Sequence, residues 1–192
     1  KMVGVDLTSA FLRGAGFSGA DLTNANLTGI DASEGIKFIG AKLVNAKMIN
    51  SSLSGANLQN ADLNGADLSG SRMASANLKG ANLTKANLTR VGLIGADLTG
   101  AKLEGVILTE ATYDKTTKFP SGFKPAEKGA IGPDANLKGK DLTGLSLSGG
   151  DFSGTDLSNA VMTRISGAYP AASFKNAKMV GVDLTSAFLR GA

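Results

Sequence analysis

Residues 56–115 read ANLQN ADLNG ADLSG SRMAS ANLKG ANLTK ANLTR VGLIG ADLTG AKLEG VILTE ATYDK. Most of these groups of five begin with a small residue, continue with a polar one and carry a large apolar residue in third place. A period of five matches neither the 3.6 residues per turn of an α-helix nor the alternation of a β-strand, so neither element keeps the apolar residues on one face. A chain that bends after every fifth residue does, and we expect the third-position side chains to point to one axis.

The pentads extend well beyond this stretch. Third positions follow one another without a break from Phe38 to Tyr113, and shorter runs occupy residues 7–27, 137–162 and 174–189. Together the runs take up roughly four fifths of the chain. The residues expected to form the core are Phe38, Leu43, Leu58, Leu63, Leu68, Leu78, Leu83, Leu88, Leu98 and Leu103.

The residue two places before each third position is also expected to point inward. This residue is small in most pentads, as at Ala56 and Ala66, because the large third-position residues already fill the axis. Gly, Asn and Ser in the last two places suit repeated tight turns. Coils stacked at ~4.8 Å would satisfy each other's backbone N–H and C=O groups, with Asp, Asn, Lys, Thr and Ser on the outside.

This pattern resembles the pentapeptide repeat family, whose signature is A-(D/N)-L-x-x. The resemblance implies an all-β fold, a right-handed quadrilateral parallel β-helix with four pentads per coil and about eight coils in this chain. Solenoids with units of 20 residues or more do not fit a five-residue repeat. The segment TKFPSGF, residues 117–123, precedes a resumed A-N-L pentad and is similar to an insert of cyanobacterial members.

Breaks in the five-residue register predict the domain organisation. Residues 1–113 are expected to form a β-helix with a bulge near 28–37, because one residue is added between two third positions there. Residues 114–134, rich in Lys, Pro and Gly, are expected to leave the coil as a loop. Residues 135–192 are expected to continue the same solenoid, with a second bulge near 165–172.

Residues 1–15, KMVGVDLTSAFLRGA, recur unchanged as residues 178–192. The duplication is either an artefact of cloning or a sign that the chain is one unit of a longer array. If the loop replaces two pentads, the copies lie eight whole coils apart, in phase, with an axial repeat of roughly 38 Å. No capping helix is expected over either end, and such a cap usually protects the exposed edges of a solenoid.

Composition excludes many activities. The 192 residues include no His, Cys or Trp, which rules out Ser-His and Cys-His dyads, thiolate zinc sites and disulfides. The sequence GGDFSGTD at 149–156 bears only a faint likeness to a calcium-binding β-roll, and its period is different. Acids in second positions are expected to stabilise turns. We therefore expect no enzyme activity, metal or cofactor. No membrane span or signal peptide is expected either, and the compartment stays open.

The net charge of +4 is concentrated in one region. Six lysines lie between residues 114 and 140, where the simplest expectation is a solvated basic loop. A nucleic-acid partner is not expected, because no basic face with interleaved aromatic residues is evident. If this loop binds a partner protein, the candidate residues are Lys115, Lys118, Phe119, Phe123, Lys124 and Lys128.

These features favour a non-enzymatic structural protein, a rigid rod that serves as a unit of a tandem or stacked fibre and has itself as partner. The alternative is an interaction scaffold that holds another protein through one face or through the 114–134 loop. A third hypothesis follows from family members that mimic DNA and bind gyrase. Mimicry requires a strongly acidic surface, and a net charge of +4 argues against it.

Overall fold

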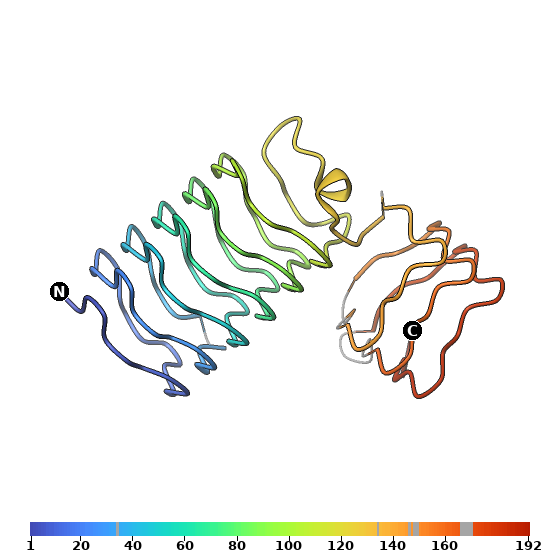
Figure 1. The fold of residues 1–192 in the computed structure, drawn as a ribbon, viewed down its shortest axis with the longest axis horizontal. Helices are drawn as coiled ribbons and strands as arrows, with labels where there is room; N and C mark the ends of the chain where they lie inside the picture. The colour runs from blue at the N-terminus through green and yellow to red at the C-terminus, as the bar shows by residue number, and fades with distance from the viewer. Residues whose placement is uncertain (34, 134, 146, 148–149, 166–170) are drawn as a thin grey trace.

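A computed structural model shows the chain as a solenoid of stacked coils with one sharp change of direction (Figure 1). Its coils are joined by isolated parallel β-bridges rather than by extended strands, and the helix η1 (Pro125–Lys128) is the one helix found in the described residues. The structure describes residues 1–33, 35–133, 135–145, 147, 150–165 and 171–192.

The bridges give the size of a coil directly. Lys42 pairs with Asp62, Asp62 with Asn82 and Asn82 with Lys102, so each bridge joins second positions that are four pentads apart. Each coil therefore takes four pentads. At every bridge the third-position amide donates to the coil ahead, as Leu43 N does to Asp62 O at 2.7 Å, and Asp62 N donates back to Ala41 O at 2.9 Å. The backbone polar groups are thus satisfied between coils.

Each corner is a tight turn closed by a hydrogen bond. Ala46 N donates to Leu43 O at 3.0 Å, and Asn45 between them has a φ of 54°. A positive φ at this place is typical of type II turns, which favour Gly and Asn. The last place of the pentad is accordingly Gly or Asn at most corners, and a lysine such as Lys85 (φ 58°) occupies the same conformation only occasionally.

Third-position side chains fill the axis of the solenoid. The ten residues expected in the core are all buried, Leu103 being the most exposed of them at 8%. The small residues two places earlier are buried beside them. Ser51 and Ser71 replace alanine in one column, where the Ser51 hydroxyl donates to Leu27 O at 2.8 Å and the Ser71 hydroxyl to Met48 O at 2.5 Å. A polar atom is accommodated there because a carbonyl of the coil below accepts its proton.

The register changes at both expected bulges. Phe11 pairs with Asp31 across four whole pentads, whereas Gly16 pairs with Lys37 across four pentads and one extra position. One residue is therefore added between 31 and 37. Asp151 pairs with Ser173 across four pentads and two extra positions, so the second bulge is larger. The bulge predicted near 165–172 lies largely outside the described residues, which omit 166–170.

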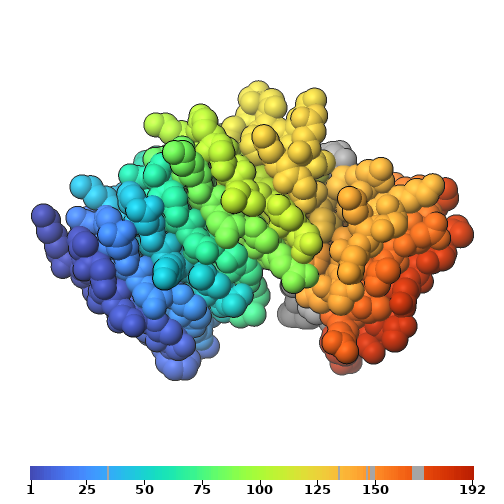
Figure 2. Space-filling model, in the orientation of Figure 1, coloured from blue at the N-terminus to red at the C-terminus, as the bar shows by residue number. Residues whose placement is uncertain are grey.

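The buried core consists of two clusters rather than one. The first part of the chain, residues 1–130, contains a cluster from Leu22 to Ala130, and the second part, residues 131–192, contains a cluster from Ile131 to Ala172. The two parts are inclined to each other (Figure 1), and Figure 2 shows a notch between them on the lower side of the view. Residues 135–192, which were expected to continue the same solenoid, thus pack around a core cluster of their own.

The 114–134 segment follows the coil more closely than a simple loop. Lys118 pairs with Asp97 and Ile131 with Thr112, so the chain completes one more turn from Thr112 to Ile131. This turn alone takes four pentad places, whereas two were expected for the whole loop. The count of two pentads on which the in-phase prediction rests is therefore wrong, and the phase of residues 1–15 and 178–192 stays a prediction.

Candidate interaction surfaces

The acidic residues in second positions are part of the turns. Asp6 Oδ1 accepts hydrogen bonds from Thr8 N at 2.9 Å and from Thr8 Oγ1 at 2.5 Å, and Asp183 does the same with Thr185 at 2.9 and 2.6 Å. These bonds favour the ionised form and lower the pKa of Asp6 and Asp183. Asn fills the same role where it replaces Asp, as Asn57 accepts from Gln59 N at 3.2 Å.

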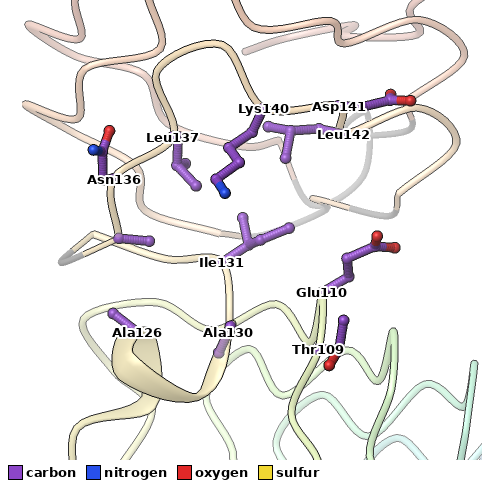
Figure 3. A pocket seen from close by; sticks show the side chains of 12 residues that line it. Thr109, Glu110, Ala126, Ala130, Ile131, Asn136, Leu137, Lys140, Asp141 and Leu142 are labelled. Atoms are coloured by element: carbon purple, nitrogen blue, oxygen red, sulfur yellow. The ribbon is translucent and has the colours of Figure 1, made fainter.

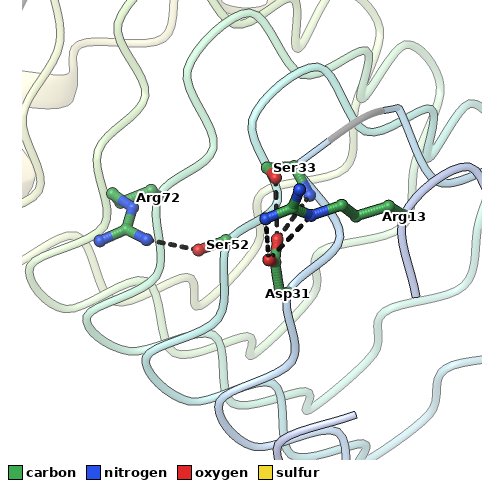
Figure 4. Close-up of polar contacts among 5 residues, drawn as sticks. All are labelled: Arg13, Asp31, Ser33, Ser52 and Arg72. Atoms are coloured by element: carbon green, nitrogen blue, oxygen red, sulfur yellow. Dashed lines mark hydrogen bonds and ion pairs between the residues drawn. The ribbon is translucent and has the colours of Figure 1, made fainter. Parts of the chain in front are cut away.

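Several of these carboxylates have further partners. The Arg13 guanidinium donates to Asp31 Oδ2 from Nη2 at 2.6 Å and from Nε at 2.9 Å, and Ser33 Oγ adds a bond at 2.8 Å (Figure 4). Arg13 and Ser33 lower the pKa of Asp31 to about 2. On the same face, Arg72 donates to Ser52 in the coil below. The Arg13–Asp31 pair was not predicted; opposite charges slightly less than one coil apart would be its signal once a coil of four pentads is recognised.

Asp97 shows a balance of opposing effects. Its partial burial raises its pKa, but hydrogen bonds from Thr99 and the charge of Lys79 outweigh this and lower the pKa to about 2. Lys79 Nζ lies 3.4 Å and Lys118 Nζ 3.6 Å from Asp97 Oδ2. The carboxylate is therefore held in its ionised form on the side of the solenoid, which suits an ion pair and not proton transfer near neutral pH.

The aromatic residues of the 114–134 segment fold back onto the first core. The Phe119 ring packs edge-on against Tyr113 with centroids 5.6 Å apart, and Phe123 stacks on Phe119 at 5.5 Å. Both phenylalanines are partly buried against the cluster of the first part. They cover the end of this core, so little of either ring is available to a partner.

The loop lysines are also distributed differently from a binding patch. Lys115 pairs with Asp151 at 3.4 Å, Lys118 with Asp97, and Lys124 with Glu127 at 2.9 Å. The bond to Glu127 raises the pKa of Lys124. Lys128 is exposed and forms no ion pair within the described chain. Three of the four candidate lysines thus form ion pairs with acidic residues of the described chain.

A buried carboxylate that was not predicted organises the start of this segment. Asp114 is 4% exposed, and its Oδ1 accepts from Gly95 N at 3.2 Å and from the amides and hydroxyls of Thr116 and Thr117 at 2.8–3.1 Å. Thr117 Oγ1 in turn donates to Leu93 O at 2.9 Å. The sequence signal for this site is D-K-T-T at a corner with one extra residue. The Asp114 carboxylate fixes the corner before Lys118.

A cavity of about 410 Å³ lies where the two parts meet (Figure 3). Thr109 and Glu110 border it from the first part, while the apolar side chains that line it are those of Ile131, Leu137 and Leu142. Lys140 points into the cavity from the second part. Bonds also cross the same junction: Ile131 pairs with the backbone of Ala111 and Tyr113, Arg90 Nη2 donates to Thr143 O at 3.1 Å, and Lys115 pairs with Asp151.

The two copies of the duplicated sequence form the first and last coils described. We call the edge of a coil that faces higher residue numbers its forward edge and the opposite one its rear edge. Residues 1–15 pair through their forward edge, as Leu7 N donates to Asn26 O at 2.8 Å. Residues 178–192 pair through their rear edge, as Asp183 N donates to Ala160 O at 3.0 Å. Apolar side chains are exposed in both copies, namely Val3 at 54%, Phe11 at 83%, Val180 at 68%, Leu184 at 40% and Phe188 at 62%.

Two further searches of the structure concern metals and membranes. Within the described residues, no group of three or more acidic side chains is placed to hold a metal ion. The described part of the chain also has no helix with the length and apolar character that a membrane crossing requires.

The family model described as pentapeptide repeats matches the chain in eight copies, over residues 1–35, 34–70, 71–110 and 134–164, which is well over half of it. None of the curated proteins compared with the chain matches its sequence. Among solved structures, the chain is similar to the pentapeptide repeat protein Rfr23 from the cyanobacterium Cyanothece 51142, with 29% identity over 60% of this chain and 88% of that protein and a TM-score of 0.45.

Two further solved structures are similar over more of the chain. HetL, a pentapeptide repeat protein involved in heterocyst differentiation regulation from the cyanobacterium Nostoc sp. strain PCC 7120, is 27% identical over 98% of this chain and 89% of its own, with a TM-score of 0.29. QnrB1, a plasmid-mediated fluoroquinolone resistance protein, is 20% identical over 93% of this chain and 84% of its own, with a TM-score of 0.32.

Proposed function

Because the chain belongs to the pentapeptide repeat family, whose members are generally non-enzymatic structural or binding proteins, we propose that it is a structural protein that associates end to end with further copies of itself. Each unit would be a right-handed quadrilateral β-helical rod with one bend. A fibre of such units would wind around its axis instead of running straight, because the bend recurs in every unit.

The observation that carries this proposal is the complementarity of the two end coils. In the first coil, Leu7 N and Val5 O pair with the backbone of Asn26. Their counterparts in the last coil, Leu184 N and Val182 O, form no backbone hydrogen bond with any described residue. Groups of this kind on a β edge bond to a further coil, and the forward edge of the identical residues 1–15 shows the geometry of that pairing.

Charge supports self-association over the mimicry of DNA. The outer positions of one face carry both signs of charge, as in Asp21, Lys42, Asp62, Asn82 and Lys102. Such a face does not imitate a line of phosphates. The net charge of +4 has the wrong sign for this role as well.

The second candidate function is an interaction scaffold, and the cavity at the junction favours it. Its apolar lining and the inward-pointing Lys140 suit an apolar side chain next to an acidic group of a partner protein. This candidate predicts discrete particles that bind another protein, whereas the fibre predicts assembly of the pure chain.

Negative-stain electron microscopy and sedimentation velocity of the purified protein test the fibre. We expect particles that lengthen with protein concentration and have the width of one β-helix. Leu184→Lys should abolish the lengthening, because it places a charge at the apolar end of the last coil, where Leu184 is 40% exposed. Ile39→Lys is the matched control, since Ile39 is 39% exposed on the side of the solenoid. Single monomers at every concentration would contradict the proposal.

A further inference from the structure

The sequence shared by residues 1–15 and 178–192 is seen pairing through each of its two edges. Its forward edge binds the second coil, where Leu7 N donates to Asn26 O at 2.8 Å and Leu12 N to Asp31 O at 2.7 Å. Its rear edge, in the other copy, binds the coil below, where Phe188 N donates to Ile165 O at 2.9 Å. One segment with this sequence has the geometry to use both edges at once.

A side-chain contact also distinguishes the two copies. Arg13 forms the two-pronged contact with Asp31 described above, at 2.6 and 2.9 Å (Figure 4). Arg190 is the identical residue of the second copy, and it forms no ion pair in the described part of the chain. The second coil thus holds a site for this arginine, and the last coil presents a second arginine that forms no ion pair in the described part of the chain.

We propose that residues 178–192 of one copy replace residues 1–15 of a second copy against its residues 21–37. The joined copies then share a single coil of this sequence. The rear edge of residues 178–192 stays on its own residues 155–165, the forward edge pairs with the second copy, and Arg190 takes the place of Arg13 on Asp31. This inference rests on the proposed end-to-end association and specifies how the ends join.

Simple stacking of the last coil beneath an intact first coil is less favourable. Stacked in register, the two identical sequences place Lys178 under Lys1, Asp183 under Asp6 and Arg190 under Arg13. Neighbouring coils are ~4.8 Å apart, and like charges directly opposite each other are destabilising. Replacement avoids all three pairs, because Asp183 then lies beside Asn26 and Arg190 beside Asp31.

Replacement also has a favourable balance of contacts. The bonds lost by the displaced residues 1–15 are remade by the identical residues 178–192. The previously unpaired Leu184 N and Val182 O gain partners, and the apolar side chain of Leu184, 40% exposed in the single copy, becomes covered. The displaced segment regains its conformational freedom, and this gain in entropy offsets part of the free-energy cost of association.

Disulfide trapping distinguishes the two modes, and the absence of Cys from the chain makes the result easy to read. Chains with Asp183→Cys are mixed with chains carrying either Asn26→Cys or Asp6→Cys under mild oxidation. Replacement predicts a disulfide between positions 183 and 26, because Asp6, the counterpart of Asp183, forms a β-bridge with Asn26 and neighbouring coils lie within disulfide range. A single chain with Asp6→Cys and Asn26→Cys should close within itself and serves as the positive control.

Each result of this experiment has one reading. A dimer of 183 with 26 and none of 183 with 6 supports replacement. A dimer of 183 with 6 alone overturns replacement but leaves end-to-end association standing. No intermolecular disulfide in either mixture, with the internal control closing, overturns both.

The two arginines give a second, independent readout by sedimentation velocity. Arg190→Ala should lower the fraction of joined copies about two- to fivefold, the range expected for one exposed ion pair. Arg13→Ala should raise the fraction of joined copies by a similar factor, since this substitution weakens only the binding of residues 1–15, the segment to be displaced. The two variants share the same local sequence, so changes in the same direction, or no change in either, would overturn the proposal.

Discussion

The first and second parts of the solenoid obey the same pentad rule but differ in the residue two places before each third position. In the first part this residue is mostly alanine, as at Ala61 and Ala81, and both are buried. The second part has Leu145, Thr155 and Ile165 there. The bridge from Asp141 to Val161 still spans four whole pentads despite Leu145 and Thr155, whereas the bridge from Asp151 to Ser173, across Ile165, is longer by two positions. Third-position residues thus keep the fold in both parts, and we expect the residue two places earlier to influence how regular each part is.

The largest expected effect tests whether the two parts are separate cooperative units. Phe38 and Phe152 are matched: both are buried, and each stacks on a phenylalanine one coil away, Phe17 at 5.5 Å and Phe174 at 5.7 Å. Phe38→Ala and Phe152→Ala should each lower the free energy of unfolding by about 3–5 kcal/mol. Hydrogen exchange by mass spectrometry should show the loss of protection confined to the part that carries the substitution.

The junction between the two parts decides whether each part can unfold separately. The bonds between them include the bridge of Ile131 with Thr112, the bond from Arg90 to Thr143 and the ion pair of Lys115 with Asp151. If Phe152→Ala also increased exchange throughout residues 1–113, the two clusters would form one cooperative unit and the comparison would fail.

A smaller effect is expected in the small column itself. The Thr155 hydroxyl is buried and has no hydrogen-bond partner within the described chain, unlike the hydroxyls of Ser51 and Ser71. Thr155→Val should therefore raise the free energy of unfolding of the second part by about 1 kcal/mol, since the shape is kept and an unpaired polar group is removed. Denaturant unfolding followed by circular dichroism measures the change.

The reciprocal substitution is made in the first part. Ala76 occupies the corresponding place and is 1% exposed. Ala76→Thr should lower stability by about 1–3 kcal/mol, because it adds volume to a packed column. A stabilising Ala76→Thr would mean that the column has spare room and that packing there does not set the regularity of the first part.

Much of the coil is predictable from the sequence because a period of five has few solutions. The family assignment is confirmed, and the position of Leu58 or Leu83 in a pentad is enough to place its side chain on the axis. Repetition makes each local preference agree with the next, which is the condition under which local rules determine a fold.

The junction is not predictable in this way. Phe119 and Phe123 were candidates for contact with a partner if the loop binds one, and in the structure they pack against the first core beside Tyr113. At Gly132, a Cβ atom would lie 2.4 Å from the Tyr113 ring, so the glycine leaves room for that ring. These contacts are non-periodic, and the sequence reveals them only when the direction of each coil is known.

The smallest expected effect compares Asp31 in the first part with Asp183 in the second as the pH falls. Both have a lowered pKa, but Asp31, beside Arg13 and Ser33, is lowered to about 2, whereas Asp183 has only the bonds from Thr185. An unfolded aspartate titrates near ~3.9. A carboxylate whose pKa is lower in the folded state adds stability that is present above the unfolded value and is lost as the pH falls through the folded one.

The protein should therefore lose thermal stability between pH 5 and pH 2, and Asp31 should account for more of this loss than Asp183. Asp31→Asn lowers the melting temperature at pH 5, where the carboxylate is ionised, and makes the further fall to pH 2 smaller than in the wild type. Asp183→Asn should change the same slope less. Melting curves by circular dichroism at pH 5, 4, 3 and 2 measure both. If the two variants flattened the acid dependence equally, the Arg13 contact would add nothing to the turn that every pentad already makes, and the first coil would be held by its backbone alone.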